Sequence, residues 1–230
     1  MAVLSQICLG LGLGNHGSRD SLLTKVLFRG RQVLIGLKKS PHDLAVHQEK
    51  VFEIDTHMGI VISGMTADAR FLTKFMRNAC LNYSYVYGSK HPCERLITQI
   101  QRKAQTKTFH PYKRPFGVGL LIGSVDAAGT HLFETCPSGN YFEYVAYAIG
   151  DKCQSAKTYF ERNFEGFAGM DANALIAQGV KAMRGSAAET ELTEHNISIG
   201  VLGRDEPFRS LSKEEVRQVL AGGEEPMQIN

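Results

Sequence analysis

The chain has 230 residues, of which 43% are hydrophobic and 21% are charged, and its formal net charge is +3. This composition is typical of a globular protein, and the length allows a sizeable buried core in one large domain or two small ones. No basic stretch is interleaved with aromatic residues, as a nucleic-acid groove requires, so we expect no nucleic-acid partner.

The cysteines give no sign of a disulfide framework or of a zinc site. Five of them are scattered along the chain, without a CxxC pair or a Cys/His ligand spacing: Cys8, Cys80, Cys93, Cys136 and Cys153. This usage indicates a reducing compartment. His42, His47 and His57 have no carboxylate or thiolate at ligand spacing and are interpreted as loop and turn histidines. We therefore expect neither a metal nor another cofactor.

Residues 1–20 differ from the rest of the chain. Positions 2–14 are apolar and glycine-rich, but no positive charges precede them and the stretch is too short to span a bilayer. We expect a mobile N-terminal segment rather than a signal peptide or a membrane anchor. A single domain over residues 21–222 and a short tail at 223–230 would follow it.

The predicted elements come in blocks of strands and pairs of helices. Apolar, partly β-branched runs bounded by turn residues predict strands at 21–28, 32–38, 51–55, 59–65, 116–122, 130–135, 141–149 and 197–202. Apolar residues spaced by three and four predict helices at 66–87, from Pro92 onward, and at 152–163, 171–184 and 212–220.

Two helix starts carry local signals. Thr66 is expected to cap the first helix, with Asp68 close to its positive end. Ser212 and Glu215 have the spacing of a capping box at the last helix. Strands in blocks argue against a parallel βαβ sheet. The order instead predicts an α+β protein, a four-layer sandwich with two stacked antiparallel sheets between helix pairs.

Several segments resemble α-type subunits of the proteasome core particle, in the family's order and spacing over about residues 21–220. The stretches that carry the resemblance are Lys-Lys-Ser-Pro (38–41), Gln-Glu-Lys-Val-Phe-Glu-Ile-Asp (48–55), Ser-Gly-Met-Thr-Ala-Asp-Ala-Arg (63–70), Lys-Arg-Pro-Phe-Gly-Val-Gly-Leu-Leu-Ile (113–122), Cys-Pro-Ser-Gly-Asn-Tyr-Phe-Glu-Tyr (136–144), Ala-Ile-Gly (148–150) and Gln-Ser-Ala-Lys-Thr-Tyr-Phe-Glu-Arg (154–162). The resemblance implies the αββα fold of N-terminal nucleophile hydrolases. The family's N-terminal gate segment and its first helix find no match in residues 1–20.

The resemblance also implies a chain without catalytic activity. The related catalytic subunits use an N-terminal threonine with a nearby acid and a lysine, and a hydroxyl needs such neighbours to attack a carbonyl. The second predicted strand ends in Leu37-Lys38-Lys39, so a lysine stands where the catalytic family has its acid. Lys50 matches the catalytic lysine position, but one member of a constellation does not make a site.

In α-type subunits the lysine at the position of Lys50 lies in a pocket between neighbouring subunits, where it pairs with the C-terminal carboxylate of an activator. Gly64 corresponds to a glycine that lines this pocket and lets a peptide backbone approach. Lys50 and Gly64 are thus the candidate activator-tail residues. The alternative for Lys50 is an exposed lysine at the end of a strand.

The function that follows is a structural subunit of a seven-membered α ring. Its partners would be the other α subunits, the catalytic β ring below, and ATPase or ATP-independent activators on the outer face, in the cytoplasm and nucleus. It would help to control substrate entry in ubiquitin-dependent protein degradation. The alternative is an N-terminal nucleophile hydrolase matured by cleavage before Ser18 or Ser21.

Overall fold

The computed structural model describes residues 23–28, 31–37, 48–150, 152–167, 170–186, 192–204 and 206–222. The predictions made for residues 1–20, for the tail at 223–230, and for His42 and His47 lie outside the described residues. Within the described part the chain forms two five-stranded sheets and two groups of helices.

Sheet A joins strands from both ends of the chain. Its order is β10 (Arg209–Ser210), β9 (Ile197–Gly203), β2 (Arg31–Leu37), β1 (Leu23–Phe28) and β8 (Ala146–Ile149). Every neighbouring pair is antiparallel. The pairs β1–β2 and β9–β10 join strands that follow one another in the chain, whereas β1–β8 and β2–β9 join distant segments.

Sheet B is a meander, because its strands lie side by side in chain order. They are β3 (Val51–Asp55), β4 (Met58–Gly64), β5 (Val118–Val125), β6 (Thr130–Thr135) and β7 (Tyr141–Glu143), all antiparallel. Two long helices, α2 (Thr66–Tyr87) and α3 (Cys93–Phe109), are inserted between β4 and β5 without disturbing this order.

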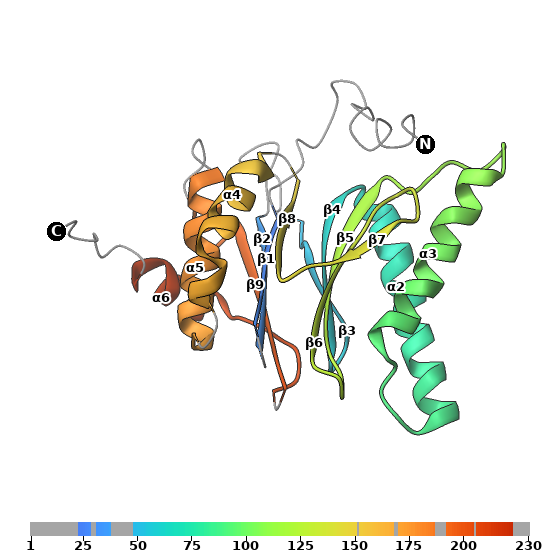
Figure 1. Ribbon diagram of the computed structural model, residues 1–230, viewed down its shortest axis with the longest axis horizontal. Helices are drawn as coiled ribbons and strands as arrows, with labels where there is room; N and C mark the ends of the chain where they lie inside the picture. The colour runs from blue at the N-terminus through green and yellow to red at the C-terminus, as the bar shows by residue number, and fades with distance from the viewer. Residues whose placement is uncertain are drawn as a thin grey trace.

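The helices lie outside the two sheets (Figure 1). Helices α2 (Thr66–Tyr87) and α3 (Cys93–Phe109) lie on the outer side of sheet B. Helices α4 (Cys153–Asn163), α5 (Ala172–Ser186) and α6 (Lys213–Gly222) lie on the outer side of sheet A, with the short η1 (Phe164–Phe167) after α4. None of the described helices is long and apolar enough to cross a membrane.

The buried apolar side chains form three groups, one for each contact between layers. Between sheet B and α2–α3 lie, among others, Met58, Ile60, Ile62, Leu72, Met76, Leu96, Ile97 and Phe116. Between sheet A and α4–α6 lie Val33, Ile35, Phe160, Phe167, Leu175, Val180 and Met183. Between the two sheets lie Leu34, Val51, Val61, Leu121, Leu132, Leu202 and Phe208. Alternate residues of β2 and β4 therefore enter different groups, as the period of a strand requires.

The predicted α+β class and the two antiparallel sheets are confirmed. The helix predicted at 66–87 and the strand predicted at 130–135 have the observed bounds. The capping box is confirmed as well. The backbone N–H of Glu215 donates to Ser212 Oγ (3.3 Å), and the N–H of Ser212 donates to Glu215 Oε2 (2.8 Å).

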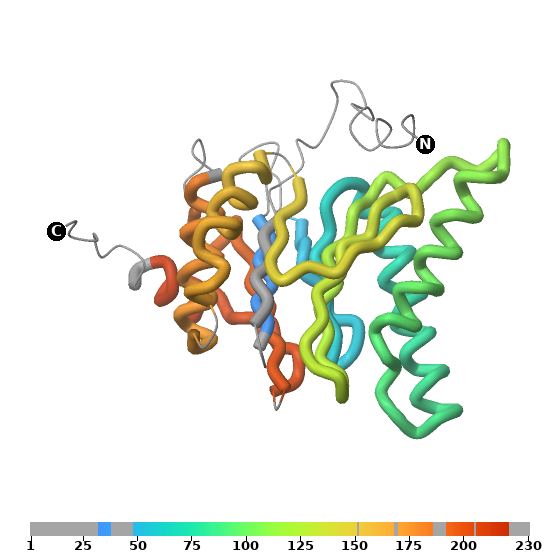
Figure 2. Tube along the Cα trace, viewed as in Figure 1, coloured from blue at the N-terminus to red at the C-terminus, as the bar shows by residue number. Residues whose placement is uncertain are grey.

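Three local predictions were wrong. The run at 141–149 is two strands in different sheets, and Figure 2 shows the yellow trace crossing between them. Thr66 does not cap α2, because it is the first helical residue and its hydroxyl donates to Gln48 Oε1 (2.8 Å). The strand predicted at 116–122 lies at Val118–Val125, since Phe116 packs in the core before the ladder begins.

Candidate functional site

Lys50 lies immediately before β3 and is buried, with 5% of its surface exposed. Its carbonyl oxygen accepts a hydrogen bond from the N–H of Ile62 (3.0 Å), which extends the β3–β4 ladder by one residue. The alternative of an exposed strand-end lysine is therefore wrong. Lysines are rarely buried unless their charge is paired. The burial of Lys50 therefore indicates that neighbouring groups compensate the charge of its ammonium.

Gly64 ends β4 at the same end of sheet B. Val51 pairs with Val61, so Lys50 lies opposite Ile62, two residues from Gly64. The structure thus brings the two predicted site residues to adjacent strand ends. They are close along the ladder, although 14 positions separate them in sequence.

A specific backbone conformation explains why residue 64 is glycine. Its φ of 111° lies in the region that side chains avoid, and a Cβ there would lie 2.3 Å from the carbonyl oxygen of Gly117. That same oxygen accepts a hydrogen bond from the N–H of Met65 (2.8 Å). The close approach of the Gly117 backbone therefore requires a glycine at position 64 in the isolated chain, whether or not a peptide binds there.

Met65 is a residue of this region that the sequence did not single out. Its side chain is 42% exposed, and its Sδ would lie 2.8 Å from a Cβ added to Gly117. An exposed, flexible thioether beside a glycine offers an adaptable apolar contact. No sequence signal marks it, because methionine at a helix N-cap looks like an ordinary core residue.

A buried carboxylate holds the backbone around Gly64 and Met65. Asp68, in the first turn of α2, accepts two hydrogen bonds from the guanidinium of Arg114 (2.6 and 2.8 Å) and one from the N–H of Gly117 (2.9 Å). The hydrogen bonds from Arg114, with that from Gly117, hold the pKa of the Asp68 carboxyl below its usual range against the opposing effect of burial. The prediction that Asp68 belongs to a helix first turn is confirmed.

A second polar cluster joins the two sheets away from this region. Glu134 on β6 is surrounded by Tyr144 and Tyr147, and Lys157 Nζ donates to the hydroxyl of Tyr147 (2.8 Å). The rings of Tyr144 and Tyr147 are stacked with centroids 4.0 Å apart. Burial raises the pKa of Glu134 and raises that of Tyr147 to about 12. These groups form a polar network that links the two sheets.

The Cys80 thiol does not have the properties of a nucleophile. Burial also raises the pKa of the Cys80 thiol to about 12, and a nucleophilic thiol needs the opposite shift. The described part holds no group of three or more histidine, cysteine or acidic residues that could bind a metal ion.

His57 lies in the β3–β4 turn, as predicted, where its Nε2 and the carbonyl of His91 are 2.9 Å apart. Lys38, Lys39, Ser18 and Ser21 lie outside the described residues.

Comparison with known proteins identifies the family. The family described as "Proteasome subunit" matches residues 26–202, which is most of the chain. The chain belongs to the proteasome subunit family. The resemblance to proteasome chains drawn from the sequence motifs is thereby confirmed.

Several α-type proteasome subunits are similar to this chain. The chain is 43% identical to proteasome subunit alpha type-1 of Dictyostelium discoideum, over 86% of this chain and 81% of the relative. It is 37% identical to alpha type-1 of Drosophila melanogaster, over 82% and 69% respectively. It is 36% identical to alpha type-1 of Caenorhabditis elegans, over 86% and 83%. The seven matching segments predict the same type of subunit, α type-1 (also called α6), and these relatives bear that name.

Proposed function

We propose that this chain is a non-catalytic subunit of the α ring of the proteasome core particle, in a four-layer sandwich of the N-terminal nucleophile hydrolase type. The observation that carries the proposal is the similarity to alpha type-1 subunits over more than four fifths of the chain. In this role it lies in a seven-membered ring, supports the catalytic β ring, and helps to control the entry of substrates in ubiquitin-dependent degradation, in the cytoplasm and nucleus. A closed ring of unlike chains requires two different contact surfaces on each subunit.

Co-expression with the other α-type subunits of the same organism tests the assembly. Native mass spectrometry is expected to find one copy of this chain in a seven-membered ring. A ring that forms without this chain, or a chain that stays monomeric beside a complete set of partners, would contradict the proposal. An intact mass that lacks the first 17 or 20 residues would instead favour a self-processed hydrolase.

The proposal includes docking of an activator's C-terminal tail at Lys50 and Gly64. The ammonium of Lys50 suits a single carboxylate, since it is a compact charge with rotatable donors. Gly64 contributes through its backbone, which a side chain would push away from Gly117. Met65 adds an exposed apolar surface beside them for the residues that precede the carboxylate.

The docking test compares peptides with a free and an amidated C-terminus, binding to the assembled ring. Fluorescence anisotropy is expected to show tighter binding of the free carboxylate, and Lys50→Ala is expected to remove that preference. Lys74→Ala is the matched control, because Lys74 is an exposed lysine of α2. An equal preference in the Lys50→Ala ring would rule out Lys50 as the carboxylate partner. Native mass spectrometry of the variant ring separates a docking defect from an assembly defect.

A further inference from the structure

The backbone at Gly64 and Met65 rests on a loop from another part of the chain. This loop, residues 110–117, connects α3 to β5. The carbonyl oxygen of Gly117 accepts the N–H of Met65 (2.8 Å), and Gly64 pairs with Val118, the first residue of β5. The position of Gly64 and Met65 therefore follows the position of the end of this loop.

One buried carboxylate holds both ends of the stretch 114–117. Asp68 accepts the guanidinium of Arg114 through both of its oxygens, with Nη1 at 2.6 Å from Oδ2 and Nη2 at 2.8 Å from Oδ1. Its Oδ2 also accepts the N–H of Gly117 (2.9 Å). A fork of two parallel hydrogen bonds fixes the direction of a contact as well as its length, which a single ammonium cannot do. The carboxylate thus sets where Gly117 lies relative to the first turn of α2.

The packing between Gly117 and its neighbours leaves little room for adjustment. A Cβ on Gly64 would lie 2.3 Å from the Gly117 oxygen, and a Cβ on Gly117 would lie 2.8 Å from the Sδ of Met65. Neither glycine has space for one further carbon atom. Because such close packing transmits displacements, a shift of Gly117 moves Gly64 and Met65 with it.

A second anchor holds the same residues from the side of Lys50. The hydroxyl of Thr66 donates to Gln48 Oε1 (2.8 Å), and the carbonyl oxygen of Lys50 accepts the N–H of Ile62 (3.0 Å). The segment that carries Lys50 is thereby tied to the start of α2. Residues 64–66 lie between this anchor and the pair formed by Asp68 and Arg114.

We propose that the Asp68–Arg114 pair is a positioning device for the docking of an activator's C-terminal tail. The pair holds Gly117 against Gly64 and Met65, so that the backbone of the site has its binding geometry before a tail arrives. A binding site needs such support, since a small misplacement of its groups weakens the ligand. The inference rests on the proposed docking at Lys50 and Gly64, and it adds two positioning residues to that site.

A positioning role and a carboxylate-binding role predict different results. The charge of Lys50 determines the preference for a free over an amidated C-terminus. The Asp68–Arg114 pair determines the backbone geometry, which both kinds of peptide use. Loss of the pair is therefore expected to weaken both peptides by the same factor and to leave the preference unchanged.

The test measures the anisotropy of fluorescein-labelled Gly-Ser-Leu-Ala-Leu, with a free or an amidated C-terminus, on binding to the assembled α ring. Asp68→Asn removes the charged acceptor, and Arg114→Lys keeps the positive charge but loses the fork. Each variant is expected to weaken both peptides on the order of 5-fold. Because the Arg114 side chain is 59% exposed, Arg114→Lys tests the proposal even if Asp68→Asn prevents folding.

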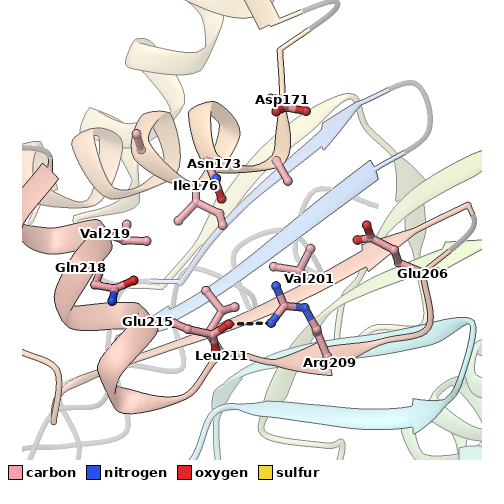
Figure 3. A pocket seen from close by; sticks show the side chains of 12 residues that line it. Asp171, Asn173, Ile176, Val201, Glu206, Arg209, Leu211, Glu215, Gln218 and Val219 are labelled. Carbon is pink, nitrogen blue, oxygen red and sulfur yellow. Dashed lines mark hydrogen bonds and ion pairs between the residues drawn. The ribbon is translucent and has the colours of Figure 1, made fainter.

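Arg209→Lys is the matched control on the other half of the sandwich. Arg209 Nη1 donates to Glu215 Oε1 (2.8 Å) in a groove between the start of α5, the strands β9 and β10, and helix α6 (Figure 3). The Arg209 side chain is 55% exposed, which is close to the value for Arg114. Since this pair does not belong to sheet B, Arg209→Lys is expected to change the binding of either peptide by less than about 2-fold.

The methyl NMR signal of Met65 reports on the geometry of the site in the ring without peptide. The signal is expected to shift in Asp68→Asn and in Arg114→Lys, and to stay in place in Arg209→Lys. A role in stability alone would lower the free energy of unfolding and leave this signal and both affinities unchanged.

The outcomes separate this inference from the docking proposal. Unchanged affinities in Asp68→Asn and Arg114→Lys, an unshifted Met65 signal, or an equal loss in Arg209→Lys would overturn the positioning role and leave the docking proposal intact. If the wild-type ring binds the two peptides equally, or if Lys50→Ala keeps the preference, the docking proposal itself fails. Native mass spectrometry checks that each variant is in a complete ring.

Discussion

The two helical layers of the sandwich differ in what they expose. On the α2–α3 layer six large apolar side chains are exposed, namely Phe71, Leu81, Tyr85, Val86, Tyr87 and Phe109, and Tyr85 is 92% exposed. Among the described side chains of α4, η1, α5 and α6, Phe164 is the only large apolar one that is comparably exposed. Exposed apolar residues gathered on one layer are typical of surfaces that other chains cover. The difference predicts that a partner chain covers the α2–α3 layer rather than the layer formed by α4, α5 and α6.

The largest expected effect on stability comes from comparing a buried with an exposed aromatic residue on the same side of the sandwich, Phe116 and Phe109. Phe116 is 2% exposed and lies under Lys107, whereas Phe109 is 75% exposed. Phe116→Ala is expected to lower the free energy of unfolding by about 3–5 kcal/mol, because a large cavity remains. Phe109→Ala is expected to change it by less than about 0.5 kcal/mol. Urea denaturation of the isolated chain measures both, and similar losses would mean that the Phe109 surface is already packed.

A second test concerns the polar anchor of the α2–α3 layer. Asp68→Asn removes a charged acceptor from Arg114 and from the N–H of Gly117, and we expect a loss of about 1–3 kcal/mol in unfolding free energy. Glu194→Gln is the matched control on the other half, because Glu194 also accepts two hydrogen bonds from an arginine, Arg217. Asp68 in addition accepts the backbone N–H of Gly117, so the effect of Glu194→Gln is expected to be smaller.

The same carboxylate gives a pH dependence at the acid end. The folded-state pKa of Asp68 is lowered, so its contribution is present above the unfolded value of about 3.9 and is lost as the pH falls through the folded value. The wild type is therefore expected to lose more stability than Asp68→Asn between about pH 5 and pH 2. Parallel curves for the two proteins would show that the Arg114 pair is not formed in solution.

A third test concerns a histidine clasp at the edge of sheet B. His131 on β6 has Nδ1 at 2.7 Å from Glu143 Oε1 and Nε2 at 3.2 Å from Asp126 Oδ1. A neutral imidazole can donate to only one of them, whereas the imidazolium donates to both. Burial opposes protonation, but the hydrogen bond and charge of Glu143 and the charge of Asp126 outweigh it and raise the pKa of His131.

The sign of the pH effect is opposite to that of Asp68. The contribution of His131 is fully present below the unfolded pKa of about 6.5 and is lost as the pH rises through the folded value. His131→Asn is expected to remove this component of the stability curve between about pH 6 and pH 9. NMR titration of the His131 ring measures the pKa directly, and a value at or below that of a free histidine would contradict the clasp.

The smallest expected effect on folding comes from the exposed end of α2. Leu81→Ser with Val86→Ser is expected to change the free energy of unfolding by less than about 0.5 kcal/mol, since both side chains face solvent. The variant is expected to self-associate less in analytical ultracentrifugation and to enter the ring less well. Phe164→Ser is the control on the other layer, and an equal effect there would remove the proposed difference between the layers.

Regular local patterns made most of the fold predictable, and long-range contacts account for what was missed. The spacing of Leu72, Met76 and Cys80 defines one buried face and so predicts α2 over its full length. The change of sheet after Glu143 has no local signal, because the run from 141 to 149 is apolar on both sides of the crossing. Strand β10 was missed because two exposed residues carry no period.

The candidate site was predictable only through family resemblance. The residue types of Lys50 and Gly64 alone indicate an exposed lysine and a turn glycine. The burial of Lys50 depends on the packing around the end of β3, and the conformation of Gly64 depends on Gly117, which is more than 50 positions away. Met65 and the Asp68–Arg114 pair emerge only when α2 is placed against the segment that leads into β5.

The different strand orders of the two sheets have a consequence for the order of events during synthesis. Sheet B pairs neighbours in chain order, so each of its strands can join the strands made before it, although β5 follows β4 only after α2 and α3. In sheet A, β1 must wait for β8, and β2 must wait for β9, which is separated from it by about 160 residues of chain. The β1–β2 hairpin is therefore made well before the strands that pair with its two edges, and both edges are open to incorrect pairing until then.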